Sequence, residues 1–307
     1  MHFLKAFVYK YREAFFMLQV NDFLLRLSLC RGIGLVSKYR LWECAQQARC
    51  FNNIEYLIDH ANISLRSASS LKNNWTSPEL DQAVGLNSQE KFITIADPLY
   101  PMTLKETYCP PLVLFYRGNL SLLHQPSIGV VGTRQITNYG QSALRGLLPP
   151  IIKRQIVVIS GLAQGVDGFS HELALKHGGL TIGVIGTGLD QAYPRNHRAL
   201  QDEVAKQGLV ISEYGRGEPP VAFHFPERNR IIAGLSEVVL VVEAKKRSGS
   251  LITANIGLDE NRSVCAVPGR IDAPLSVGCN SLIAAGAKPI LSAQDLLDEF
   301  RLYDSRA

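Results

Sequence analysis

The sequence predicts an α/β protein with a doubly wound, mostly parallel sheet, preceded by a small all-α domain. Three observations support this fold class. Residues 17–85 carry apolar side chains at helical spacing, and after about residue 90 short β-branched runs alternate with helical stretches. Most of these runs are apolar throughout, which indicates strands that are buried on both faces. A chain of 307 residues is long enough for one large domain or two.

The first helices are indicated by Phe23, Leu24 and Leu27, which recur at helical spacing. Gly32-Ile33-Gly34 then predicts a turn, and a second helix follows through Leu35–Trp42. This segment therefore reads as a small helical module that begins with a helix, a glycine turn and a helix.

Residues 1–16 are basic and aromatic, but charges interrupt them and no small-residue cleavage site follows. They do not have the pattern of a signal peptide. Met17 stands just before the regular helical pattern, so we expect it to be the true start and residues 1–16 to be an extension outside the fold. The expected domains are then residues 17–85, which are helical, and residues 86–307, which are α/β.

The α/β part contains eight clear strands and seven helices in alternation. The predicted strands are Phe92–Ala96, Leu112–Tyr116, Ile128–Val131, Ile156–Ser160, Leu180–Ile185, Leu209–Ser212, Val238–Glu243 and Val264–Val267. The predicted helices are 139–148, 164–177, 195–207, 226–234, 250–260, 278–286 and 293–301. This alternation is typical of a Rossmann-like sheet with helices on both faces. Pro149-Pro150 should end or kink the first of these helices.

The composition excludes several classes of protein. Hydrophobic residues make up 46% and charged residues 19%, so the chain is not disordered. The net charge of +5 permits a polyanionic partner, but many enzymes have a similar charge. The six cysteines have no zinc-ligand spacing, so we expect no metal and a reducing, cytoplasmic location. No run of 18 apolar residues occurs, and we expect no membrane partner.

The informative feature is the set of turns that follow three predicted strands. They are Gly132-Thr133-Arg134, Gly161–Gly165 and Gly186-Thr187-Gly188. In a parallel sheet these exits share one edge, where ligands bind. Glycine lets a backbone approach an anion closely, and the next helix offers unpaired N–H groups. The turns predict a phosphate pocket, although tight packing of strand on helix also requires glycine.

Basic residues near the same edge suggest a chain of phosphates rather than one mononucleotide. Each arginine alone could equally be a solvated surface charge. The predicted DNA-binding or phosphate-binding residues are Gly132, Thr133, Arg134, Ser160, Gly161, Gln164, Gly165, Gly186, Thr187, Gly188, Arg195, Asn196, Arg228, Asn229, Arg230, Lys245, Arg247, Ser248, Gly249 and Ser250.

Cofactor and catalytic motifs are missing. Gln191 occupies the third glycine position of a dinucleotide fingerprint that starts at Gly186, and no P-loop sequence occurs. Asp167 and His171 lie one helical turn apart, and we interpret them as structural rather than as a dyad. The segment Phe223–Phe225 either packs in the core or stacks on bases. We therefore expect no cofactor, no catalytic residue and no enzyme activity.

Seven segments of this sequence resemble, in order, the DprA/Smf DNA-processing family. They are Val130–Arg134 with Tyr139-Gly140; Ser160–Asp167 with His171; Gly186–Asp190 with Tyr193-Pro194; Ser212–Tyr214; Phe225–Ile232; Val241–Ala244 with Ser248–Ala254; and Val267–Gly269 with Gly278–Ile283. The resemblance covers roughly residues 90–300.

The resemblance implies an extended Rossmann-like domain that binds single-stranded DNA without catalysis, behind a SAM-like helical domain. It also implies loading of the recombinase RecA during natural transformation, and a homodimer. Arg134 and Arg195 match the arginine and the basic residue that line the family's DNA pocket. Gln164 departs from the family, because many members have a basic residue there.

Two other functions stay open. A related Rossmann fold serves phosphoribohydrolases, which need a PGGxGT-type loop, but here Pro268-Gly269 is followed by Arg270-Ile271-Asp272. The chain could instead be an interaction module in which contact with RecA dominates over DNA.

Overall fold

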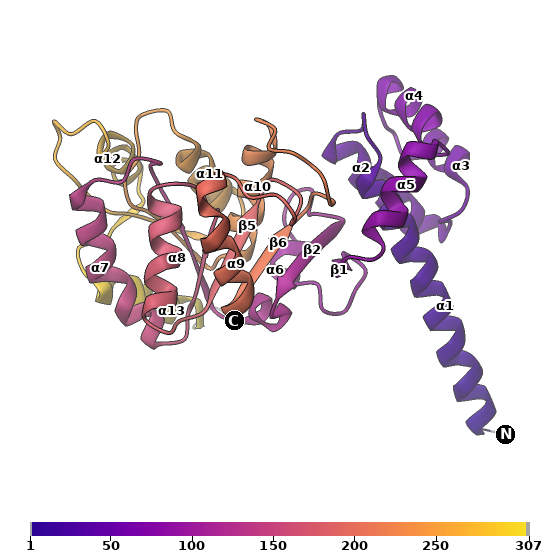
Figure 1. Ribbon diagram of the computed structural model, residues 1–307, viewed down its shortest axis with the longest axis horizontal. Coiled ribbons are helices and arrows are strands. Elements are labelled where there is room, and N and C mark those ends of the chain that lie inside the picture. Colours follow the sequence, from indigo (N-terminus) through magenta and orange to yellow (C-terminus); the bar gives the residue numbers. More distant parts are fainter. Residues whose placement is uncertain (1, 305–307) are drawn as a thin grey trace. The chain divides into compact units, whose positions relative to one another are not determined.

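The computed structural model describes the backbone of residues 2–304 and the side chains of residues 16–300. The chain divides into two compact units (Figure 1). The first holds Met1–Tyr100 and Tyr108–Phe115, and the second holds Pro101–Thr107 and Tyr116–Ala307. The side chains of residues 1–15 lie outside the described ones, so for them the expectation of an extension outside the fold stays a prediction. The centre of the Phe16 ring lies 5.5 Å from that of Phe51 in the first unit.

The first unit is mainly helical. Its elements are α1 (His2–Leu29), α2 (Leu35–Ala48), α3 (Ile54–His60), α4 (Leu65–Asn74), α5 (Pro78–Asn87) and β1 (Phe92–Thr94), which pairs antiparallel with β2 (Val113–Gly118). Asn53, Ser64 and Ser77 start α3, α4 and α5 by accepting a backbone N–H of the first turn. Gly32, at φ +77°, makes the turn between α1 and α2 that its sequence predicts.

The second unit alternates strands and helices as predicted. Its elements are α6 (Met102–Lys105), η1 (Leu120–His124), β3 (Ser127–Val131), α7 (Asn138–Lys153), β4 (Val157–Ser160), α8 (Val166–Lys176), β5 (Thr181–Ile185), η2 (Arg195–His197), α9 (Arg198–Gln207), β6 (Leu209–Ser212), α10 (His224–Leu235), β7 (Val238–Val241), α11 (Gly249–Asp259), β8 (Ser263–Ala266), α12 (Val277–Ala284), β9 (Lys288–Pro289) and α13 (Ala293–Asp304).

The strands of this unit form a parallel sheet in the order β6-β5-β4-β3-β7-β8-β9. From β3 the chain adds β4, β5 and β6 on one side and then crosses to place β7 on the other side of β3. This reversal creates a crevice at the carboxyl ends of β3 and β7, where doubly wound sheets bind ligands. The predicted α/β fold class is confirmed.

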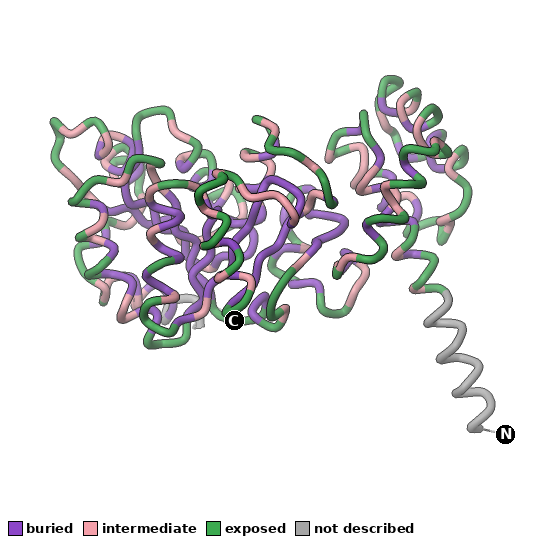
Figure 2. The backbone as a smooth tube through the Cα atoms, in the orientation of Figure 1, coloured by how far each residue is buried: buried purple, intermediate pink, exposed green. Residues whose placement is uncertain are grey.

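Apolar strands form the core of this sheet, which appears as the purple centre of the second unit in Figure 2. On one face α7, α8 and α13 pack over β3, β4, β7 and β8, with Leu144, Leu148 and Ile151 of α7 fully buried. Helices α10 and α11 pack together against the strands and against each other. Burial on both faces explains why these strands are continuously apolar.

One of the two outcomes predicted for Pro149-Pro150 does not occur. Helix α7 does not end there but runs on to Lys153, and the alternative outcome, a kink, stays a prediction. Each proline removes one backbone donor, but Leu147, Leu148, Ile151 and Ile152 are all buried on the same helix. Burial of these side chains outweighs the local cost of the prolines.

None of the helices in the described part of the chain is both long enough and apolar enough to cross a bilayer.

Candidate nucleic-acid interface

A pocket of about 870 Å³ lies at the crevice between the exits of β3 and β7. Five segments line it: the turn after β3, the loop after β4, the segment after β5 that holds Tyr193, the start of α10 with the loop before it, and the segment that joins β7 to α11. The predicted residues among its lining are Gly132, Thr133, Arg134, Gln164, Arg228, Asn229, Lys245, Ser248, Gly249 and Ser250. The structure thus brings half of the predicted phosphate-binding residues to one hollow.

The first two glycine turns lie directly against each other. The N–H of Val166 donates to the carbonyl of Thr133 at 3.0 Å. Gly165 has φ +75°, and a Cβ on it would lie 2.3 Å from the same carbonyl oxygen. Only glycine fits this close approach, so these turns need glycine both for their own packing and to open the backbone toward the pocket.

Arg134 is exposed and lies over an aromatic ring. Its guanidinium carbon is 5.7 Å from the centre of the Phe225 ring, a cation–π distance. The centre of the exposed Tyr193 ring lies 5.2 Å from that of Phe225. The pocket therefore combines a cation with two rings, and Phe225 is half-buried rather than a core residue.

Helix α11 begins at the pocket with hydroxyl groups. Ser248 and Ser250 share a hydrogen bond of 2.8 Å between their Oγ atoms, and no side chain caps the helix. Asn229 donates from Nδ2 to the carbonyl of Gly249 at 3.3 Å, which ties α10 to α11. The exposed Lys245 also lines the pocket, so an anion there would meet a cation and a helix N-terminus.

The third glycine turn lies at the same edge but is not in the pocket lining. Gly186, Thr187 and Gly188 are all buried. Ser212 Oγ donates to the carbonyl of Thr187 at 2.6 Å, and the N–H of Gly188 donates to the carbonyl of Glu218 at 2.9 Å. The segment after β6 covers this turn, so tight packing accounts for its glycines.

Several predicted cations lie elsewhere on the edge. Arg195 and Asn196 in η2 and Arg247 after β7 are exposed, but they do not line the pocket. Arg230 pairs with Glu213 at 2.6 and 2.7 Å, and both side chains are largely buried. This pairing occupies the Arg230 guanidinium within the protein.

Arg228 is part of the pocket lining but is only 4% exposed. Its Nη1 donates to the carbonyl of Val184 in β5 at 2.7 Å. Burial lowers the pKa of the arginine, while the nearby Asp167 carboxyl opposes this effect. A direct role in DNA contact is therefore harder to assign to Arg228 than to Arg134.

A buried polar network continues below the loop after β4. Ser160 Oγ donates to the Val130 carbonyl at 2.6 Å, and Asp167 Oδ2 accepts the N–H of Gly161 at 3.2 Å. Burial raises the pKa of Asp167, and Arg228 opposes this rise. The remaining predicted residues, Ser160, Gly161 and Gly165, thus shape the loop from below.

His171 bonds to Thr181 rather than to Asp167. Thr181 Oγ1 donates to the Val158 carbonyl at 2.7 Å, so the 2.7 Å contact with His171 requires the imidazole Nδ1–H to be the donor. Burial, together with the nearby Arg228, lowers the pKa of His171 to about 3. The interpretation of Asp167 and His171 as structural groups agrees with these contacts.

Some lining residues were not predicted from the sequence. Tyr193, Ile252 and Thr253 all line the pocket. Ile252 and Thr253 lie three and four residues after Gly249 on α11, so helical spacing from the serine-glycine start could have identified them. Tyr193 offered no local signal, because its place depends on the fold of the 187–197 segment.

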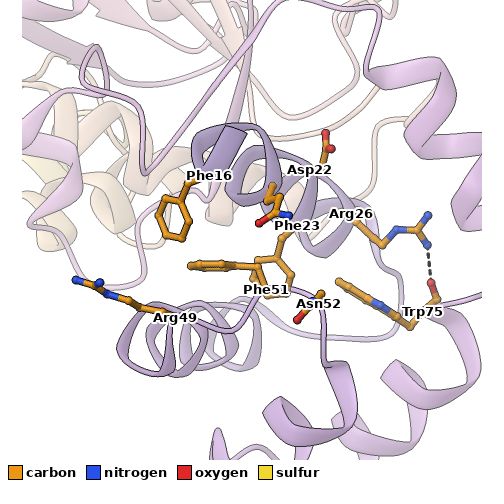
Figure 3. A pocket seen from close by; sticks show the side chains of 9 residues that line it. Phe16, Asp22, Phe23, Arg26, Arg49, Phe51, Asn52 and Trp75 are labelled. Carbon is orange, nitrogen blue, oxygen red and sulfur yellow. Dashed lines mark hydrogen bonds between the residues drawn. The ribbon is translucent and has the colours of Figure 1, made fainter. Parts of the chain in front are cut away.

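A second hollow, of about 470 Å³, lies within the helical unit (Figure 3). Phe16, Phe23, Phe51 and Trp75 line it, and their rings pack edge to face or tilted at 5.5–5.8 Å. Arg26 donates to the Trp75 carbonyl at 2.6 Å and pairs with Asp81. Four rings occupy much of this lining, and Arg26 is already bound within the protein, whereas the α/β pocket presents the exposed Arg134 and Lys245 beside a helix N-terminus. The α/β pocket is therefore the better candidate for a phosphate ligand.

The described residues contain no cluster of three or more His, Cys, Asp or Glu side chains that could hold a metal ion.

Comparison with known families matches residues 91–301 to the family described as DNA recombination-mediator protein A. The chain is 48% identical over 224 residues to DNA processing protein DprA of Streptococcus pneumoniae, covering 72% of this chain and 79% of that protein. It is 43% identical over 237 residues to DNA processing protein DprA of Bacillus subtilis, covering 76% and 80%.

Solved structures agree with these sequence relations. The crystal structure of S. pneumoniae DNA processing protein A superposes with a TM-score of 0.83 at 38% identity, over 92% of this chain and 97% of that one. The Helicobacter pylori protein, whose structure is described for its single-stranded DNA binding mode, has a TM-score of 0.62 at 31% identity, over 71% and 99%. The match of residues 91–301 spans the whole pocket described above.

Proposed function

The chain belongs to the DNA recombination-mediator protein A family, and on that premise we propose that it binds single-stranded DNA without sequence preference and loads RecA recombinase onto it. The observation that carries the proposal is the pocket between β3 and β7, where Arg134 lies over Phe225 beside two interlocked glycine turns. The H. pylori relative is described as binding single-stranded DNA.

The contacts of the pocket suit the sugar-phosphate backbone of a single DNA strand. We assign the phosphates to Arg134 and Lys245, to the N-terminus of α11, and to the exposed Arg195 and Arg247 further along the edge. Tyr193 and Phe225 offer ring faces for bases. Because every base has a π-face, such stacking tolerates any sequence, which supports binding without sequence preference.

The family's description as a recombination mediator supports transfer of the DNA strand to RecA as part of this proposal. A protein that grips mainly phosphates, through contacts that salt weakens, can release the strand in steps to a recombinase. We further propose that the protein acts as a homodimer in the cytoplasm, without catalysis and without a cofactor, as the resemblance to its family implies.

The test is a titration of fluorescent single-stranded and double-stranded oligonucleotides across a salt series. The Arg134→Ala/Arg195→Ala variant should weaken binding to every single-stranded sequence. Each lost phosphate contact on a single strand lowers the slope of log K against log salt by about 0.7, so the slope should fall by roughly 1.4.

Arg154→Ala is the matched control. Arg154 is exposed and follows the last turn of α7, at the opposite end of that helix from the pocket. Its removal also lowers the net charge by one but should leave the slope nearly unchanged. Equal affinity of wild type and the double variant at all salt concentrations would exclude this pocket as the DNA site.

A further inference from the structure

We propose that Arg228 and Asp167 form a buried positioning pair that fixes the glycine turn after β4 and balances charge beneath Arg134, and that neither residue contacts DNA. This inference rests on the proposed function, because it assigns how the same pocket is held ready for phosphates. It also changes the role that the sequence suggested for Arg228.

The Arg228 side chain lies directly against the glycine turn after β4. Arg228 is 4% exposed, and a Cβ placed on Gly161 would lie 1.5 Å from its Nη1. The guanidinium therefore lies against the Gly161 backbone, in the space that a side chain at this position would fill. Its Nη1 also donates to the Val184 carbonyl at 2.7 Å. One side chain from α10 thus contacts the turn after β4 and the strand β5 beside it.

Asp167 binds the same glycine turn from another helix. Asp167, in the first turn of α8, is 8% exposed, and its Oδ2 accepts the N–H of Gly161 at 3.2 Å. Gly161 is thereby held through its N–H by Asp167 and at its Cα by Arg228. The position of the turn depends on both residues, which lie on two different helices.

The charges of Arg228 and Asp167 also affect each other. Both members of the pair line the pocket floor below Arg134. Each compensates the other: Arg228 opposes the rise in the pKa of Asp167, and Asp167 opposes the fall in that of Arg228. With the pair intact, the Arg134 charge remains available to a phosphate. Without Arg228, the Asp167 carboxyl under the phosphate site loses the cation that opposes the rise in its pKa, so it is left either as an unpaired negative charge or as a protonated acid that binds the turn less strongly.

The experiment compares Arg228→Gln, Asp167→Asn and the double variant in single-stranded DNA binding. Arg228→Gln should weaken binding by about tenfold or more, because it releases the glycine turn and leaves the buried Asp167 carboxyl without its cation. The double variant also removes that carboxyl, so it should bind at least about threefold more tightly than Arg228→Gln, although more weakly than wild type, and show coupling in a double-mutant cycle. If Arg228 instead contacted a phosphate, the double variant would bind as weakly as Arg228→Gln, and this result would overturn the proposal.

Arg228→Lys separates position from charge. Lysine keeps the positive charge but has no planar fork to lie against Gly161 and reach Val184. We expect weaker binding at every salt concentration with an unchanged slope. Wild-type affinity of this variant would contradict a positioning role.

A measurement without DNA covers the case in which a variant is unstable or the wild type fails to bind. Deuterium uptake by a peptide spanning residues 160–165 should rise in Arg228→Lys, while uptake by the β7 peptide, residues 238–241, should not change. Unchanged uptake at 160–165 would refute the pair. Absence of binding by wild type, with the uptake result as expected, would count against the proposed function alone.

Discussion

Replacing His171 with Asn should remove a large part of the acid sensitivity of folding. His171 is fully buried on α8, and its Nδ1–H donates to Thr181. The side-chain amide of Asn can supply a donor at nearly the same place but does not titrate. The substitution therefore tests the proton equilibrium of the imidazole more than its packing.

The magnitude follows from the pKa of His171, which burial lowers from 6.5 to about 3. As the pH falls below 6.5, the unfolded chain binds a proton here and the folded protein does not. Stability is therefore lost on acidification, by about 1.4 kcal/mol per pH unit between 6.5 and 3, or at most about 5 kcal/mol in all. The sign is that of a group whose pKa is depressed by folding.

The assay is urea unfolding of wild type and variant at several pH values from 7.5 to 4.5. The variant should be less stable at pH 7.5, because some packing is lost, but the difference should shrink by about 1.4 kcal/mol for each unit below 6.5. His177→Asn, at an exposed position just after the same helix, is the control and should follow wild type. Parallel stability curves for wild type and His171→Asn over this range would refute the reasoning.

Two predictions concern helix α7. Glu243 is buried and accepts the N–H of Thr137 at 2.9 Å and its hydroxyl at 2.6 Å, so Glu243→Leu should cost about 2 kcal/mol in urea unfolding, because both Thr137 donors lose their acceptor; an unchanged midpoint would show that the carboxylate is not needed. Gln155 is exposed just after the helix and has φ +61°, a left-handed conformation that glycine adopts without strain. Gln155→Gly should therefore raise the melting temperature by about 2–4 °C in calorimetry. A lower melting temperature would contradict the presence of this strain.

The fold was predictable because local and global signals agree in the second unit. Strands such as Val238–Val241 are apolar at every position, and the structure buries all four residues. Each strand is followed by a turn or by the start of a helix, so its carboxyl end can be located in the sequence. In a parallel sheet these carboxyl ends lie at the same edge. The same logic placed Gly132 and Gln164 at one pocket before any contact was known.

The prolines of α7 show where local rules fail. The sequence gives no sign that Leu148 and Ile151 will face strands more than eighty residues further along the chain, such as Val238. Once that contact forms, the helix gains more from burial than it loses at the two missing donors. A rule based on residues within one helical turn cannot include the free energy gained by burying side chains against such distant strands.

The basic residues show the same limit for function. Arg228 and Arg230 follow each other in one short motif, and nothing in their sequence separates them from Arg134 as phosphate ligands. Their roles diverge because Glu213 reaches Arg230 from 17 residues away and the Val184 carbonyl reaches Arg228 from 44. A buried arginine fixes the shape of a site, and an exposed one supplies charge to a ligand. Whether an arginine is buried or exposed depends on the partner that the tertiary structure brings to it. Counting cations along a sequence therefore overestimates the number of side chains that can contact a phosphate chain.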